Sequence, residues 1–103
     1  MYNKLVRNKI PEIIRSNGEE PIVEILDNEN YKIELEKKLL EECNEVLSSN
    51  GNNRLEELAD LLEVMISLAD LDDKTFDDIE KIRIDKKSKR GGFSKRLYLK
   101  DVR

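Results

Sequence analysis

The sequence predicts a single, mainly all-α domain spanning residues 1–103, and three observations point to this fold class. Apolar residues recur at the three- and four-residue steps of a helical face over long stretches. These stretches are bounded by residue types that begin or stop helices. Charged residues make up 41% and apolar residues 38% of the chain, which is typical of helices with a narrow apolar stripe and a charged solvent face.

The first helix is expected to be short and to be followed by a strand. Proline is favourable at the first helical position, so the helix starts at about Pro11, and Gly18 suits a left-handed stop. Residues 21–26 alternate in the β-branched pattern of a short strand. A second strand is expected at about 96–100, and the two strands would pair as a small two-stranded β ribbon beside the helices.

Two long antiparallel helices form the centre of the predicted fold. The first is capped by Asp27 or Asn28 and runs to about Ser48. A polar loop at 48–53 is short enough to bring the next helix back alongside it. That helix, 54–71, is apolar nearly all round in its second part, so we expect it to be buried on most sides.

A C-terminal helix completes the fold. Thr75 caps this helix and Asp78, three residues later, is its capping-box partner. The helix ends at Gly91-Gly92, and its inward face is formed by Phe76, Ile79 and Ile82.

Several classes of protein are disfavoured by the bulk features of the chain. One cysteine, Cys43, leaves no intrachain disulfide and no cysteine-based zinc cluster, and we expect its side chain to be buried. No apolar run approaches the roughly 20 residues that span a bilayer, and the N-terminus lacks a signal-peptide pattern. We therefore expect a cytoplasmic protein without a membrane partner. Its thin core suggests that a second subunit covers part of its apolar surface.

Charge is strongly segregated along the chain. Residues 1–15 carry four basic residues against one acidic residue, and residues 81–103 carry ten against two, whereas the middle is strongly acidic. This pattern fits a metal site flanked by phosphate-binding residues, and it fits equally well an uneven spread of charge over solvent-facing helices.

Two carboxylate pairs on the central helices are candidates for a metal site. Glu42/Glu45 and Glu57/Asp60 are each three residues apart, so the members of each pair are neighbours about 5–6 Å apart at Cβ. Two such charges about 5 Å apart repel by about 3 kcal/mol at an effective dielectric constant of about 20, and a divalent cation removes this repulsion. An all-oxygen ligand set without histidine favours Mg²⁺, with Mn²⁺ as a substitute. The alternative is a solvated acidic face with ordinary ion pairs along the helix; Asp60, in the most apolar helix, favours the metal site.

Basic residues at both ends of the chain are candidates for phosphate binding. Arginine and lysine side chains match phosphate oxygens, and Gly91-Gly92 permits close approach of the backbone. An ordinary helix C-terminus explains the nearby lysines at 86, 87 and 89 but explains the arginines less well. The sparse aromatic residues and the acidic middle disfavour nucleic acid as a partner. The candidate phosphate-binding residues are Lys4, Arg7, Lys9, Arg90, Lys95 and Arg96.

Together these motifs resemble a known family. Glu41-Glu42-Cys43-Asn44-Glu45 followed by Glu57-Leu58-Ala59-Asp60 is similar to the E-E-x-x-E and E-x-x-D metal signature of the MazG-type all-α nucleoside triphosphate pyrophosphohydrolases. The termini, residues 2–11 and Arg90-Gly91-Gly92-Phe93, resemble those of the small house-cleaning, phosphoribosyl-ATP pyrophosphohydrolase-like branch. The chain differs from the histidine-pathway enzymes, which typically carry a Tyr-His pair soon after the aspartate, because Leu61-Leu62-Glu63-Val64 follows Asp60.

The resemblance implies a fold, a reaction and a set of roles. It implies a MazG-like helical bundle that hydrolyses a nucleoside triphosphate, standard or non-canonical, between the α- and β-phosphates. Mg²⁺ would be held by Glu42, Glu45, Glu57 and Asp60, with Glu41 as the catalytic residue that orients or deprotonates water. It also implies a homodimer or a dimer of dimers. Two alternatives remain: a catalytically silent nucleotide-binding or helical interaction module, and a nucleic-acid-binding protein that uses the basic C-terminal segment.

Overall fold

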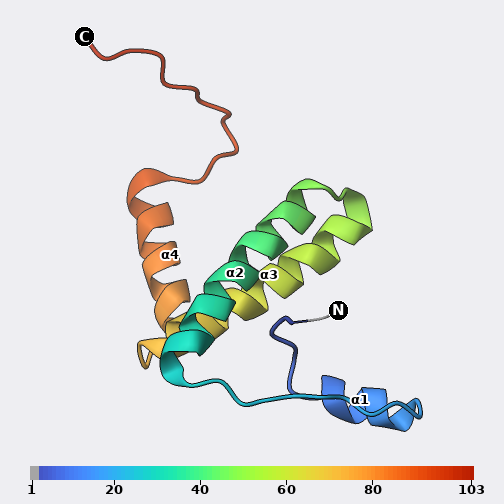
Figure 1. Ribbon diagram of the computed structural model, residues 1–103. Coiled ribbons are helices and arrows are strands. Elements are labelled where there is room, and N and C mark those ends of the chain that lie inside the picture. Colours follow the sequence, from blue (N-terminus) through green and yellow to red (C-terminus); the bar gives the residue numbers. More distant parts are fainter. Residues whose placement is uncertain (1–2) are drawn as a thin grey trace.

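A computed structural model describes residues 3–103, which contain four helices and no strand. The helices are α1 (Ile10–Ser16), α2 (Asn28–Leu47), α3 (Gly51–Leu71) and α4 (Phe76–Arg90). Helices α2 and α3 form an antiparallel hairpin that contains the main interhelical contact, and α4 begins beside the C-terminal end of α3 (Figure 1). The all-α prediction, with two long antiparallel helices and a C-terminal helix, is confirmed.

Local sequence explains most of the helix boundaries. The Asp27 carboxylate accepts a hydrogen bond from the backbone N–H of Asn30 at 2.8 Å, which caps α2 as expected. At the start of α4, Thr75 and Asp78 form the predicted reciprocal capping box. Helix α4 ends at Gly91, whose φ of 81° lies in the region that favours glycine.

Helix α3 begins earlier than predicted. The loop before it is only Ser48–Asn50, and α3 starts at Gly51 rather than at Arg54. The first N–H groups of any helix lack partners within it, so poor helix formers such as Asn52 and Asn53 are tolerated in that turn. The loop between the two helices is therefore three residues long.

The two predicted strands are wrong. Neither 21–26 nor 96–100 is a strand, so the β ribbon is absent from the described residues 3–103. Ile22 and Ile25 are fully exposed in an irregular connection between α1 and α2. A strand needs a partner for its backbone groups, and β-branched alternation does not supply one.

The apolar core is smaller than the sequence indicated. Leu35 of α2 and Val64 of α3 are the buried apolar residues of the described chain. The expectation that the second central helix is buried on most sides is wrong, because α2 covers only one side of it and α4 contacts it only near its C-terminal end. On α4, Ile79 is half-buried but Ile82 remains 59% exposed, so the predicted inward face is only partly covered. Cys43, predicted to be buried, is half-buried.

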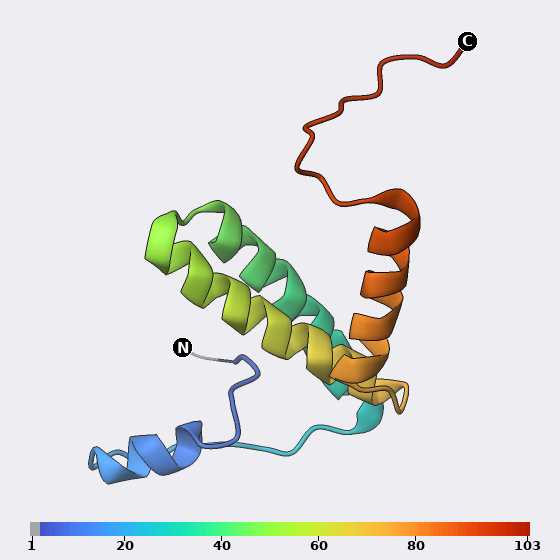
Figure 2. The same ribbon diagram turned by 180° about the vertical axis from the view of Figure 1, so that it is seen from behind.

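The molecule is elongated, with extents of 62 × 32 × 23 Å. Figures 1 and 2, which show opposite sides, agree that the segment after α4 runs away from the helical hairpin. Within residues 3–103, none of the helices has the length and apolar character needed to cross a bilayer.

Candidate metal centre

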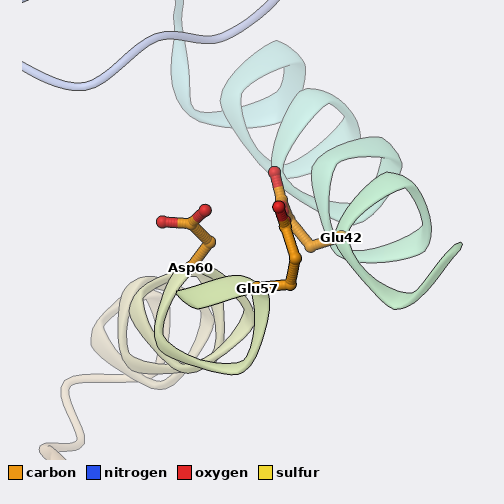
Figure 3. Close-up of side chains that lie close together, drawn as sticks. All are labelled: Glu42, Glu57 and Asp60. Carbon is orange, nitrogen blue, oxygen red and sulfur yellow. The ribbon is translucent and has the colours of Figure 1, made fainter. Parts of the chain in front are cut away.

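Three carboxylates from the two central helices meet at one point of the hairpin. Glu42 of α2 and Glu57 and Asp60 of α3 each offer an oxygen, and these three oxygens lie within 4.8 Å of one another (Figure 3). Glu42 is buried, with 8% of its surface exposed, and the other two residues are half-buried. The structure therefore brings together three of the four predicted metal ligands.

The helical repeat explains why these acids face each other. Glu42 comes seven residues after the buried Leu35 and so lies on the same face of α2. Glu57 and Asp60 come seven and four residues before Val64, on the face of α3 that packs against α2. Because the short loop makes the helices antiparallel, the two acidic pairs lie at matching heights of the hairpin.

Glu45, the fourth predicted ligand, is exposed and lies outside this set of three. It still acts on the site electrostatically. Partial burial raises the pKa of Glu57, and repulsion from the Glu45, Asp60 and Glu42 carboxylates raises this pKa further. The carboxylates of Glu42, Glu45 and Asp60 therefore all act electrostatically on Glu57. Of these four residues, only Glu42, Glu57 and Asp60 bring oxygens within 4.8 Å of one another.

Arg7 reaches this site from the N-terminal segment. Its guanidinium donates a hydrogen bond to Asp60 Oδ1 at 2.7 Å and links residues 53 positions apart. The predicted phosphate-binding residue is thus paired with a predicted metal ligand. Asp60 is also less enclosed than the apolar sequence around it indicated, because 45% of its side chain is exposed.

Lys38 also lies beside the three carboxylates and was not predicted from the sequence. Its Nζ lies 3.7 Å from Glu42 Oε1 and 3.9 Å from Glu41 Oε2. Lysine three or four residues before a glutamate lies on the same side of a helix, so this spacing was the available signal. Glu41, predicted to be the catalytic residue, is exposed beside this lysine.

Lys4 lies close to the same part of α2. A shallow open hollow of about 130 Å³ is lined by Asn3, Lys4 and Leu5 from the N-terminal segment and by Glu34, Lys37, Lys38 and Glu41 from α2. Lys9 is exposed and immediately precedes α1. Two of the three N-terminal basic candidates, Lys4 and Arg7, therefore lie beside the acidic helices.

The three C-terminal basic candidates do not join the carboxylates of their own chain. Arg90, Lys95 and Arg96 line a separate hollow of about 260 Å³ formed by the turn at residues 90–97. Over the described residues, 3–103, no ion pair connects this turn to α2 or α3. Within one chain, the C-terminal basic candidates therefore lie apart from the acidic site, because α4 carries that end away from the hairpin.

Comparisons with known proteins add one partial similarity. No family model matches the chain, and no solved structure matches it. Over 47 residues the chain is 38% identical to an uncharacterized protein of Mycolicibacterium smegmatis (strain ATCC 700084 / mc(2)155). The similarity covers 46% of this chain and 48% of the mycobacterial protein, so it spans about half the length of each.

Proposed function

We propose that this chain is a Mg²⁺-dependent nucleotide pyrophosphohydrolase of the MazG type, which hydrolyses a nucleoside triphosphate to a monophosphate and pyrophosphate. The observation that carries the proposal is the convergence of Glu42, Glu57 and Asp60 from two helices, with one oxygen of each within 4.8 Å of the others. Mn²⁺ would substitute for Mg²⁺ because it prefers similar oxygen ligands.

The donor set fits a hard divalent cation. All three groups are carboxylates, and the nearby Glu45 adds negative charge that acts on Glu57. The raised pKa of Glu57 reflects an electrostatic cost that a cation between the helices would remove. When bound, Mg²⁺ would neutralise phosphate charge and lower the pKa of a coordinated water.

The remaining roles fall to nearby side chains. Arg7 and Lys38 supply positive charge at the edge of the site, and Lys4 adds charge in the adjoining hollow. The Arg7 guanidinium is able to exchange the Asp60 carboxylate for a phosphate group, since each offers two oxygens that accept hydrogen bonds from its N–H groups. Glu41 directly precedes Glu42 on α2 and is exposed beside Lys38, and in this proposal its carboxylate takes the proton from an attacking water.

The test measures pyrophosphate release from a panel of standard and modified nucleoside triphosphates with Mg²⁺, with Mn²⁺ and with EDTA. We expect release with either metal and none with EDTA. Asp60→Asn should lower kcat/KM by at least about 100-fold, since even loss of an outer partner of a metal ligand costs 10–100-fold. Asp70→Asn, the same change at an exposed position of α3, is the matched control and should retain wild-type activity.

Two results would contradict the proposal. Wild-type activity in a folded Asp60→Asn protein would reject the metal assignment. Nucleotide binding without any pyrophosphate release, under every metal condition, would favour the catalytically silent module instead.

A further inference from the structure

A single chain exposes far more surface than a compact domain of its mass. Its accessible surface is 9751 Å², whereas a compact monomer of this mass exposes about 6,000 Å². Its radius of gyration is 18.0 Å, whereas about 13 Å is usual for a compact domain of this length. The excess is large enough to supply an obligate dimer interface, which buries roughly 2,000–5,000 Å² or more.

Part of the excess is an ordered apolar face on the α2–α3 hairpin. Its members recur at steps of three, four and seven residues, which is the spacing of helices that pack against other helices. They lie on the sides of both helices that are turned away from the buried Leu35 and Val64. This apolar face consists of Ile33, Leu40, Leu47, Leu55, Leu58, Leu62 and Met65, all of them exposed.

The rest of the excess lies in the C-terminal arm, residues 91–103. Every residue of the arm is exposed, including large apolar side chains such as Phe93 and Leu97 at 98% and 86%. The arm carries four basic residues against Asp101. Exposed apolar and charged side chains in one extended segment are typical of a segment that packs on another molecule.

The opposite charge lies on the hairpin. Residues 28–71, which include both helices and the loop between them, contain four basic residues against eleven acidic ones. The acids concentrate around the candidate metal centre, where Glu45, Asp60, Glu42 and Glu56 all act on Glu57. We call this region, defined by those five residues, the acidic side. It lies across the helices from the apolar face, so one copy can pair by its apolar face and leave the acidic side open to an arm.

We propose that the C-terminal arm of one copy lies against the acidic side of the α2–α3 hairpin of a second copy, and that Lys95 and Arg96 complete the site there. The inference rests on the proposed function: Arg7, Lys38 and Lys4 of the same chain supply only part of the positive charge for a polyphosphate, and the C-terminal basic candidates lie away from the site in the single chain. The basic arm and the acidic side have opposite charge, and the apolar face of the hairpin is uncovered. Both features favour a second copy of this chain as the binding partner.

The arm is long enough for this arrangement. Its 13 residues span up to about 45 Å when extended, at about 3.5 Å per residue. A helix with its side chains is about 10–12 Å across, so an arm that starts at the end of α4 can cross a neighbouring two-helix layer.

The test detects proximity between copies and needs no nucleotide. In a Cys43→Ser background, a nitroxide spin label is attached at Ser94→Cys of the full chain, and this protein is mixed with an equal amount of ¹⁵N-labelled Cys43→Ser protein without a label. We expect the amide signals of Glu45, Glu56 and Asp60 in the ¹⁵N-labelled copy to be lost through broadening. Cys43→Ala serves as the background if Cys43→Ser is unfolded.

Charge reversal provides the matched control. Lys95→Glu together with Arg96→Glu in the spin-labelled copy should restore those signals. Lys86→Glu together with Lys87→Glu, an equal change of net charge on exposed residues of α4, should leave the broadening in place. Absence of broadening in the ¹⁵N-labelled copy would overturn the inference, because the arm would then be free or folded on its own chain.

Activity provides a second, independent readout. Mixing Asp60→Asn with the Lys95→Glu/Arg96→Glu variant should restore turnover that neither has alone, because a mixed dimer keeps one intact site. Broadening without any pyrophosphate release supports the arm contact and rejects only the proposed function. Release without broadening rejects the arm contact and leaves the proposed function standing.

Discussion

The three central carboxylates differ in whether a positively charged side chain lies beside them. Asp60 is paired with Arg7 at 2.7 Å, and Glu42 lies 3.7 Å from the Lys38 ammonium. No ion pair within residues 3–103 engages Glu57, which is also the acid whose pKa is raised by partial burial and by its acidic neighbours. Of the three carboxylates, Glu57 is therefore the one whose negative charge is least favourable in the folded state.

Glu57→Gln tests this difference through the pH dependence of stability. Because the pKa of Glu57 is raised in the folded state, its ionisation costs folding free energy, and this cost appears as pH rises from the unfolded-state pKa through the folded-state pKa. In EDTA at neutral pH we expect Glu57→Gln to be more stable than the wild type, with the difference vanishing at acid pH. Chemical denaturation across pH measures this.

Added Mg²⁺ should reverse the order, since it stabilises the chain with the intact ligand set more strongly. Glu63→Gln, at an exposed acid of α3 outside the set of three, is the control for loss of one negative charge. Equal stability of Glu57→Gln and wild type at neutral pH without metal would contradict an unfavourable charge on Glu57.

Of the long helices, α4 depends most on local interactions within its own sequence for its stability. Its residues from Lys81 onwards are all exposed, so tertiary packing contributes little to its second half. Its start is held by the capping box, in which hydrogen bonds from the Thr75 backbone and side chain lower the pKa of Asp78. Stabilisation by the box is therefore present above the ordinary carboxyl pKa and is lost as pH falls through the lowered value.

Thr75→Ala removes the cap and should lower the free energy of unfolding by about 1 kcal/mol, with a loss of helical circular dichroism from α4. Thr75→Ser keeps the hydroxyl and should remain close to wild type. Urea denaturation over a series of decreasing pH values measures both variants, and the penalty of Thr75→Ala should shrink as pH falls through the lowered pKa of Asp78. A penalty that stays constant down to the pH at which Asp78 is fully protonated would show that the charge of Asp78 does not contribute to the cap.

At the scale of the whole molecule, stability is expected to depend on protein concentration. Leu35 and Val64 form a very small buried apolar core, whereas seven large apolar side chains line the exposed face of the hairpin. Association that covers this face stabilises the folded state by mass action. We expect Tm to rise with protein concentration in thermal scans.

Leu40→Lys, in the middle of the apolar face, should reduce association in sedimentation measurements and remove the concentration dependence of Tm. Ser88→Lys on the exposed part of α4 is the control and should change neither property. A Tm that is independent of concentration, together with monomeric sedimentation of the wild type, would contradict this expectation.

Helix boundaries could be predicted from the sequence, whereas strand pairing and contacts between distant residues could not. The start of α2 at Asp27 and the start and end of α4 were predictable because a cap is a local hydrogen bond between residues close in sequence. The strand at 21–26 was wrongly predicted because pairing depends on a distant partner. Of the site, the carboxylate positions followed from helical spacing, whereas the Arg7–Asp60 pair joins residues 53 positions apart and has no local signal.

The sequence by itself determined that the chain is helical, where most helices begin and end, and which acids share a helical face. These properties depend on interactions between residues a few positions apart, and the helical spacing of apolar and acidic residues can be read directly from the sequence. Only the tertiary structure decided that Glu42, Glu57 and Asp60 converge, that Arg7 joins them and that the basic arm does not. Those outcomes depend on how helices pack and on where α4 directs the chain, and packing is determined by contacts between distant residues.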